Sequence, residues 1–203
     1  EILNEDGTMA RRPELEKFAE KHNLKIGTIA DLIEYRNLNE TTIQKVAQCN
    51  MPTEYGDFEL HTFKDSIDNQ LHFALKKGEI KEDEPTLVRV HLHNTFSDLL
   101  GSTRGIHRSM TLADGMRKIS EEGGVLVLLG KEEHIESQVR RFAAEDRGER
   151  PTGADWQGSS RTIGVGSQIL ASMGVHKMRL LSKPIKYHAL SGYGLEVVEY
   201  VHD

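Results

Sequence analysis

Residues 124–130 read GVLVLLG, an unbroken apolar run bounded by glycines and too short for an ordinary helix. Such a run is typical of a strand buried on both faces, as in a sheet that helices cover on each side. A helix is expected just before it, over 110–123, with Leu112, Met116 and Ile119 on one face. The run therefore favours an α/β fold, with a mixed sheet flanked by helices.

The other predicted elements continue this pattern. Strands are expected at 42–65 (a hairpin that turns around Gly56), 71–80, 86–93, 177–181 and 195–201, and a helix at 164–174, with Met173, Met178 and Leu180 in the core. The stretch 138–159 is charged and rich in turn residues. Its first part fits a helix, and its second part fits a long loop of the functional or disordered kind.

The first forty residues have a different organisation. Helical segments are expected from Pro13 to about Asn23, and over 30–36, where Thr28 and Asp31 form a capping-box pattern. A short strand is expected between them, at 24–29. The polar stretch 37–41 has no periodicity and is interpreted as a linker. The predicted division is thus a short unit at 1–36, the linker, and a larger domain at 42–203.

Composition excludes several classes of protein. The net charge of −6 argues against a general nucleic-acid binder, and no apolar run approaches the length of a membrane span. Cys49 is the single cysteine, so an intramolecular disulfide and a multi-cysteine zinc site are both excluded. A cytoplasmic location is the simplest expectation, and Cys49 is expected to be a small apolar core residue. The chain starts without Met, in what resembles the middle of a strand and turn, so we expect a fragment of a longer protein.

The stretch 91–109, HLHNTFSDLLGSTRGIHRS, follows a predicted strand and contains three histidines. His91 and His93 are two residues apart, which places them on the same side of a regular strand. Together with His107 they would suit a metal ion. The alternatives are a loop that binds phosphate and a site that no longer works.

Two parts of the chain resemble known families. Residues 1–36, EILNEDGTMARRPELEKFAEKHNLKIGTIADLIEYR, resemble the C-terminal end of 3,4-dihydroxy-2-butanone 4-phosphate synthase. Residues 41–203 resemble GTP cyclohydrolase II, through KVAQCNMPTEYGDF, HFALKKGEI, LVRVH, IGVGSQILASMGVHKMRLL and GYGLEVVE. The order is that of fused bifunctional riboflavin-biosynthesis proteins. The resemblance implies a GTP cyclohydrolase II-like α/β domain, preceded by a short piece of an α+β synthase domain.

The resemblance also implies what has changed in the loop. In GTP cyclohydrolase II the loop after LVRVH carries three zinc-binding cysteines, and Asn94, Gly105 and His107 stand at those positions here. An amide is a poor zinc ligand, and glycine has no side chain at all. The zinc site of the family is therefore expected to be lost, and a site rebuilt from His91, His93 and His107 is the alternative.

Other positions that the family uses are only partly kept. Ser159 stands where the family has its general-base aspartate. Glu133 replaces a glycine and would repel a triphosphate. Arg161 matches the arginine near that base and is the candidate catalytic residue kept in this domain. Inherited groups that could still contact a nucleotide or flavin are Arg89, Glu132, Ser182 and Lys186, together with Arg161. In the synthase part, Glu1 matches a glutamate that serves catalysis in that family, although the rest of that site lies upstream of this segment.

From the resemblance we expect the parent protein to be a lyase, the synthase that converts ribulose 5-phosphate to 3,4-dihydroxy-2-butanone 4-phosphate and formate with Mg²⁺. The domain at 42–203 is expected to be non-catalytic, to need no cofactor, and to dimerise, stabilise or regulate the attached synthase. A homodimer is the family expectation. The alternatives are a nucleotide or flavin sensor and an active cyclohydrolase with a histidine metal site.

Overall fold

The computed structural model describes residues 2–40, 42–104, 110–130, 133–149, 160–184 and 190–202. Within these residues, seven strands form one mixed sheet in the order β1-β2-β3-β5-β4-β6-β7. The strands are β1 (Ile43–Thr53), β2 (Gly56–Asp65), β3 (Leu71–Lys77), β4 (Thr86–Leu92), β5 (Gly124–Leu129), β6 (Lys177–Leu181) and β7 (Glu196–Val201). The half from β1 to β5 is antiparallel, and β5, β4, β6 and β7 run parallel. The predicted mixed sheet is confirmed.

The apolar run at 124–130 forms β5, in the middle of the sheet. Its side chains alternate between two cores, so that Val125 and Val127 pack into one cluster and Leu126 into the other. All three are fully buried. The expectation that this strand is buried on both faces is confirmed.

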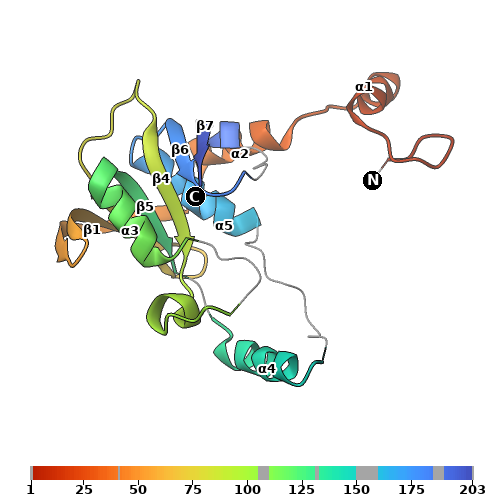
Figure 1. The fold of residues 1–203 in the computed structure, drawn as a ribbon. Helices are drawn as coiled ribbons and strands as arrows, with labels where there is room; N and C mark the ends of the chain where they lie inside the picture. Colours follow the sequence, from red (N-terminus) through yellow and green to blue (C-terminus); the bar gives the residue numbers. More distant parts are fainter. Residues whose placement is uncertain are drawn as a thin grey trace.

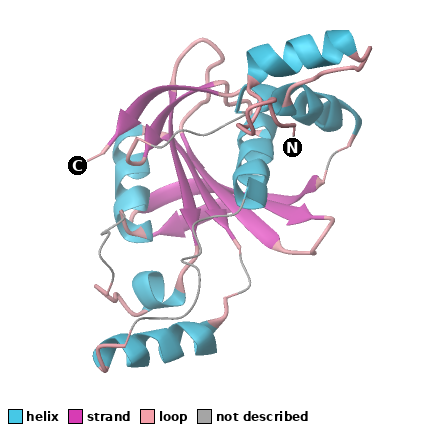
Figure 2. Ribbon diagram, turned by 90° about the vertical axis from the view of Figure 1, so that its right-hand side faces the viewer, coloured by secondary structure: helices cyan, strands magenta, loops and turns pink. Residues whose placement is uncertain are grey.

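One helix covers each face of the sheet (Figures 1 and 2). Helix α5 (Ser160–Ser172) inserts the fully buried Ile169 into the cluster of Val125 and Val127. Helix α3 (Leu112–Glu122) inserts Met116 and Ile119 into the cluster on the other face, as predicted from their spacing. These two layers fix the sheet and thereby the loops at the strand ends.

The antiparallel hairpin of β1 and β2 forms where predicted, with its turn before Gly56. However, β1 is the edge strand, and most of its side chains after Ile43 are exposed. Cys49 lies on this strand and is exposed, so the expectation of a core cysteine was wrong. A strand at the edge of the sheet lacks the cover that a central strand receives.

The N-terminal segment contains α1 (Arg12–Lys21), with Pro13 in its first turn, and α2 (Ile29–Asn39). The capping box of Thr28 and Asp31 is present, as predicted. The strand expected at 24–29 was wrong: residues 24–28 are irregular, no described strand pairs with them, and Leu24 is exposed. The polar stretch 37–41 is helical as far as Asn39, so α2 extends into the expected linker.

Two further elements lie at one end of the sheet. The π-helical turn η1 (Thr95–Leu99) follows β4, and helix α4 (Ile135–Asp146) follows β5. Figure 1 shows α4 beside η1 and away from the sheet. Helix α4 confirms the helix expected after 138. Of the loop predicted at 147–159, residues 147–149 form a turn and the rest lies outside the described residues. None of the helices in the described ranges is long and apolar enough to cross a membrane.

Candidate functional site

The predicted site residues that the structure describes gather at the carboxyl end of the parallel strands. Arg89 and His91 lie on β4, His93 follows it, and Ser182 follows β6. In α/β sheets, ligands bind outside this end of the strands, where the connections change direction. The loop after β4 therefore lies where a ligand of this fold would bind.

His91 points to a carboxylate within its own loop. Its Nε2 lies 2.9 Å from Oδ2 of Asp98, and both side chains are almost completely buried. Burial lowers the pKa of His91 below its ordinary value, although the Asp98 carboxylate opposes this effect. The imidazole is therefore neutral at pH 7. Because a carboxylate can only accept, Nε2 carries the proton and donates it to Asp98.

Asp98 has further donors around it. Its Oδ2 also accepts a hydrogen bond from the backbone N–H of Asn94 at 2.9 Å, and Oδ1 accepts one from Ser97 Oγ at 3.2 Å. Burial works to raise the pKa of Asp98, but the hydrogen bonds from Asn94 and His91 outweigh it and the pKa is lowered. The charged Asp98 carboxylate thus joins the end of β4 to the loop that follows it, through hydrogen bonds from His91, Asn94 and Ser97.

Asn94, at a position where the related family has a zinc-binding cysteine, has a capping role here. Its Oδ1 accepts hydrogen bonds from the backbone N–H groups of Phe96 and Ser97, both at 3.0 Å, and so caps η1. Sequence reasoning missed both this cap and Asp98. The sequence did contain a signal for the cap, because Asn is a preferred N-cap residue at the start of a helical turn.

Glu133 joins the loop after β5 to the loop after β4. Its Oε1 accepts a hydrogen bond from the backbone N–H of Thr95 at 2.8 Å, and its Oε2 accepts one from the Thr95 hydroxyl. The same carboxylate lies 3.4 Å from Nδ1 of His93. Sequence reasoning assigned Glu133 only a repulsive effect on phosphate, whereas in the structure it fixes the two loops to each other.

Helix α4 is held against the same loop by aromatic and ionic contacts. The rings of Phe96 in η1 and Phe142 in α4 meet edge to face, with centroids 5.1 Å apart. Arg104 lies over the Phe142 ring and pairs with Asp146 at the end of α4. The loop after β4 and α4 therefore form one connected unit.

The described residues do not fit the zinc ion that the resemblance implies. No group of three or more His, Cys, Asp or Glu side chains suited to a metal occurs in the part of the chain that the structure describes. His91 and His93 each face a different carboxylate, and the Asn94 oxygen already accepts two backbone hydrogens. His107, the third member of the histidine alternative, lies outside the described residues, as does Gly105.

The predicted nucleotide contacts are only partly visible. Arg89 donates from Nη1 to the carbonyl of Leu181 at 2.7 Å and from Nη2 to that of Met110 at 3.0 Å. Two of its donors thus tie β4 to the end of β6 and the start of α3. Ser182 donates its hydroxyl to the Lys183 carbonyl. The backbone of Arg161 lies in the first turn of α5, and its side chain is not described; Glu1, Glu132, Ser159 and Lys186 lie outside the described residues.

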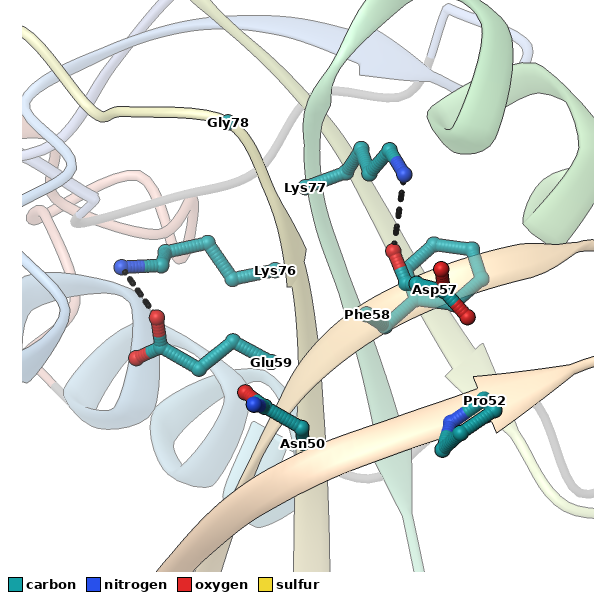
Figure 3. Close-up of a pocket in the computed structure, with 8 residues that line it drawn as sticks. All are labelled: Asn50, Pro52, Asp57, Phe58, Glu59, Lys76, Lys77 and Gly78. Carbon is teal, nitrogen blue, oxygen red and sulfur yellow. Dashed lines mark hydrogen bonds and ion pairs between the residues drawn. The ribbon is translucent and has the colours of Figure 1, made fainter.

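A surface hollow of about 470 Å³ lies elsewhere, on the hairpin side of the sheet (Figure 3). It is lined by Asn50, Pro52, Asp57, Phe58, Glu59, Lys76, Lys77 and Gly78. Its two lysines both have partners: the Lys76 ammonium lies 3.1 Å from the Glu59 carboxylate, and Lys77 donates to the backbone carbonyl of Asp57. None of the residues selected from the sequence lines this hollow.

Comparison with known proteins agrees with this architecture. Residues 44–202 match the family model for GTP cyclohydrolase II, and residues 1–35 match the model for 3,4-dihydroxy-2-butanone 4-phosphate synthase. The chain belongs to the GTP cyclohydrolase II family and carries a short synthase segment before that domain.

Relatives of the chain include proteins of riboflavin biosynthesis. The chain is 52% identical to a 3,4-dihydroxy-2-butanone 4-phosphate synthase of Photobacterium phosphoreum, over 99% of this chain and 54% of that protein. It is 43% identical to the riboflavin biosynthesis protein RibBA of Aquifex aeolicus, over 99% of this chain and 52% of that protein. The chain therefore spans about half the length of these relatives.

A solved structure matches the whole of this chain. The crystal structure of RibBX, a two-domain 3,4-dihydroxy-2-butanone 4-phosphate synthase from A. baumannii, matches 100% of this chain and 53% of its own. The two are 41% identical, with a TM-score of 0.58. The expected resemblance and the α/β fold are both confirmed.

Proposed function

We propose that this chain is the C-terminal portion of a riboflavin-biosynthesis protein whose other domain is the synthase. That synthase would convert ribulose 5-phosphate to 3,4-dihydroxy-2-butanone 4-phosphate and formate, with Mg²⁺ bound in its own site. The GTP cyclohydrolase II-like domain, residues 42–203, would be non-catalytic. Its role would be to support the synthase, as a homodimerising, stabilising or regulatory module.

The main support for this proposal comes from the loop after β4. Opening the guanine ring of GTP requires a metal that activates water, and thiolates hold zinc tightly where neutral oxygen donors do not. The only cysteine of the chain, Cys49, lies on the edge strand β1. In the loop itself Asn94 caps η1, and Asp98 is buried against His91. These groups stabilise a closed loop, and among the residues that the structure describes no set of side chains replaces the family's metal ligands.

The charges around the loop support the same conclusion. By the family resemblance Glu133 stands in place of a glycine of the nucleotide loop, and its carboxylate would repel a triphosphate there. The guanidinium of Arg89 donates to two backbone carbonyls inside the fold. Ser159 has no carboxylate with which to act as the general base of the family. Each change alone weakens catalysis, and together they remove the metal, the base and part of the nucleotide contact.

The support role is tested by comparing the full-length protein with a version that ends before residue 42. We expect the shortened protein to lose synthase activity faster on heating, to dissociate from dimer to monomer, or to change its kcat. Identical activity, association state and thermal inactivation would contradict the proposal.

A thermal-shift measurement separates this proposal from a sensor function. Ligands that bind the native state raise the melting temperature according to their concentration and affinity. We expect no shift with millimolar GTP, GDP or FMN. A shift that is lost in the variants Arg161→Ala and Lys186→Ala would favour a nucleotide or flavin sensor instead.

A further inference from the structure

The helix that precedes the cyclohydrolase-like domain packs directly on that domain. Helix α2 lies in the segment that matches the synthase family as far as residue 35, and it contacts the short helix η2 (Leu190–Tyr193) near the other end of the chain. Figure 1 shows the orange α2 next to the blue C-terminal elements. Two segments that match different families are therefore in contact.

The centre of this contact is a glycine. Gly192 is buried, and a Cβ atom at this position would lie 2.6 Å from the carbonyl oxygen of Ala30 and 3.1 Å from the Ile33 side chain. Its φ is not in the left-handed region. The backbone of η2 therefore does not itself require glycine here. The requirement comes from the close approach of α2, because no other residue leaves room for the Ala30 carbonyl.

The opposite side of η2 is anchored in the core of the cyclohydrolase-like domain. Tyr193 and Leu190 pack against the large core cluster, and the neighbouring Leu195 is buried within it. The Tyr193 hydroxyl also lies close to Gly164 in α5, where an added Cβ would meet it at 3.0 Å. The position of η2 is thus fixed by the core. Because close-packed interiors transmit strain, a displacement of η2 would displace α2 as well.

The other side of α2 is apolar and open to solvent. Ile29, Leu32 and Tyr35 are 73%, 58% and 64% exposed, whereas Ala30 and Ile33 are partly covered. Residues of this exposure and spacing form a stripe along a helix. The relatives contain about as many residues again as this chain, and residues 1–35 match the synthase family. The occupant that fits this stripe is the synthase domain itself.

We propose that α2 is shared between the two domains, with one face seated on Gly192 and the other packed against the synthase domain of the same chain. Gly192 would then be the joint through which the cyclohydrolase-like domain supports the synthase. This inference rests on the proposed support function and specifies where that support acts.

The test uses the full-length protein with the variants Gly192→Ala, Gly192→Leu and Ile33→Asp. Ile33→Asp disturbs the contact from α2 and leaves η2 unchanged, so it covers the case in which a substitution in η2 prevents folding. Gly27→Ala is the matched control, because a Cβ there meets nothing within 4 Å and its φ is not in the left-handed region. The measurements are hydrogen exchange of the α2 amides and the rate of thermal inactivation of the synthase.

We expect Gly192→Leu and Ile33→Asp to speed exchange in α2 by about tenfold or more and to speed inactivation of the synthase. Gly192→Ala should give a smaller effect of the same sign, and Gly27→Ala none. Unchanged exchange in α2 in all the Gly192 and Ile33 variants would overturn the joint. If removal of residues 42–203 harms the synthase while these variants do not, only the joint is wrong. If that removal is harmless, the support function itself is wrong.

Discussion

Asp98→Ala should destabilise the domain more than any exposed aspartate substitution. The Asp98 carboxylate accepts hydrogen bonds from His91 at 2.9 Å, from the backbone of Asn94 at 2.9 Å and from Ser97 at 3.2 Å. Its side chain is 4% exposed and that of His91 is 7% exposed. Removing the carboxylate therefore leaves the buried imidazole N–H of His91 and the backbone N–H of the partly buried Asn94 without their acceptor.

The size of the effect follows from these contacts. A hydrogen bond to a charged group contributes about 1.5 to 3 kcal/mol, and a buried donor left unpaired costs about 1 to 3 kcal/mol. Because neighbouring contacts are not additive, we expect a total loss of about 2 to 4 kcal/mol in the free energy of unfolding. For a chain of this size that corresponds to a fall of about 5 to 15 °C in melting temperature.

The assay is urea and thermal unfolding at pH 7.5, followed by circular dichroism. Asp83→Ala is the matched control, because Asp83 is exposed in the turn between β3 and β4, and it should change stability by less than about 0.5 kcal/mol. If Asp98→Ala destabilises no more than Asp83→Ala, the loop is not held by this carboxylate. A melting temperature of the unsubstituted chain that rises with added Zn²⁺ would refute the argument in another way, because the loop would then bind a metal.

Three further predictions concern other contacts. Phe142→Ala should remove the edge-to-face contact with Phe96 and speed hydrogen exchange throughout α4 while leaving β5 protected. Burial lowers the pKa of His61 and of His91, so the unfolded chain takes up protons that the folded chain does not. Stability should be constant above pH 6.5 and fall below it, by up to about 1.4 kcal/mol per pH unit for each histidine; His61→Gln should reduce this slope in urea titrations between pH 6.5 and 5. Thr111→Ala removes the N-cap of α3 and should cost about 0.5 to 2 kcal/mol in the same unfolding assay.

The sequence predicts the central elements because their signals are local. The run at 124–130 and the spacing of Met116 and Ile119 identify β5 and α3, and the cap at Thr28 identifies the start of α2. Two of the errors concern elements that depend on distant neighbours. Alternation at 24–29 does not show whether a second strand is available for pairing, and a strand-like run around Cys49 does not show whether the strand is central or at an edge.

The candidate site was predicted less completely. His91 and His93 were selected, but the carboxylates that face them, Asp98 and Glu133, were not recognised as partners. Glu133 is separated by 38 residues from Thr95, to which it is hydrogen-bonded. Only the parallel pairing of β4 with β5 brings the two loops together. Local patterns cannot reveal a contact that the topology of the sheet creates.

The most direct test of a non-catalytic domain is formate release from GTP by the purified full-length protein, with zinc supplied and no ribulose 5-phosphate present. Under these conditions the synthase has no substrate, so any formate must come from the guanine ring. We expect no release above the buffer control and no retained zinc. Continuous release of formate with about one zinc ion per chain would contradict the account, and would place an active metal site in the loop after β4.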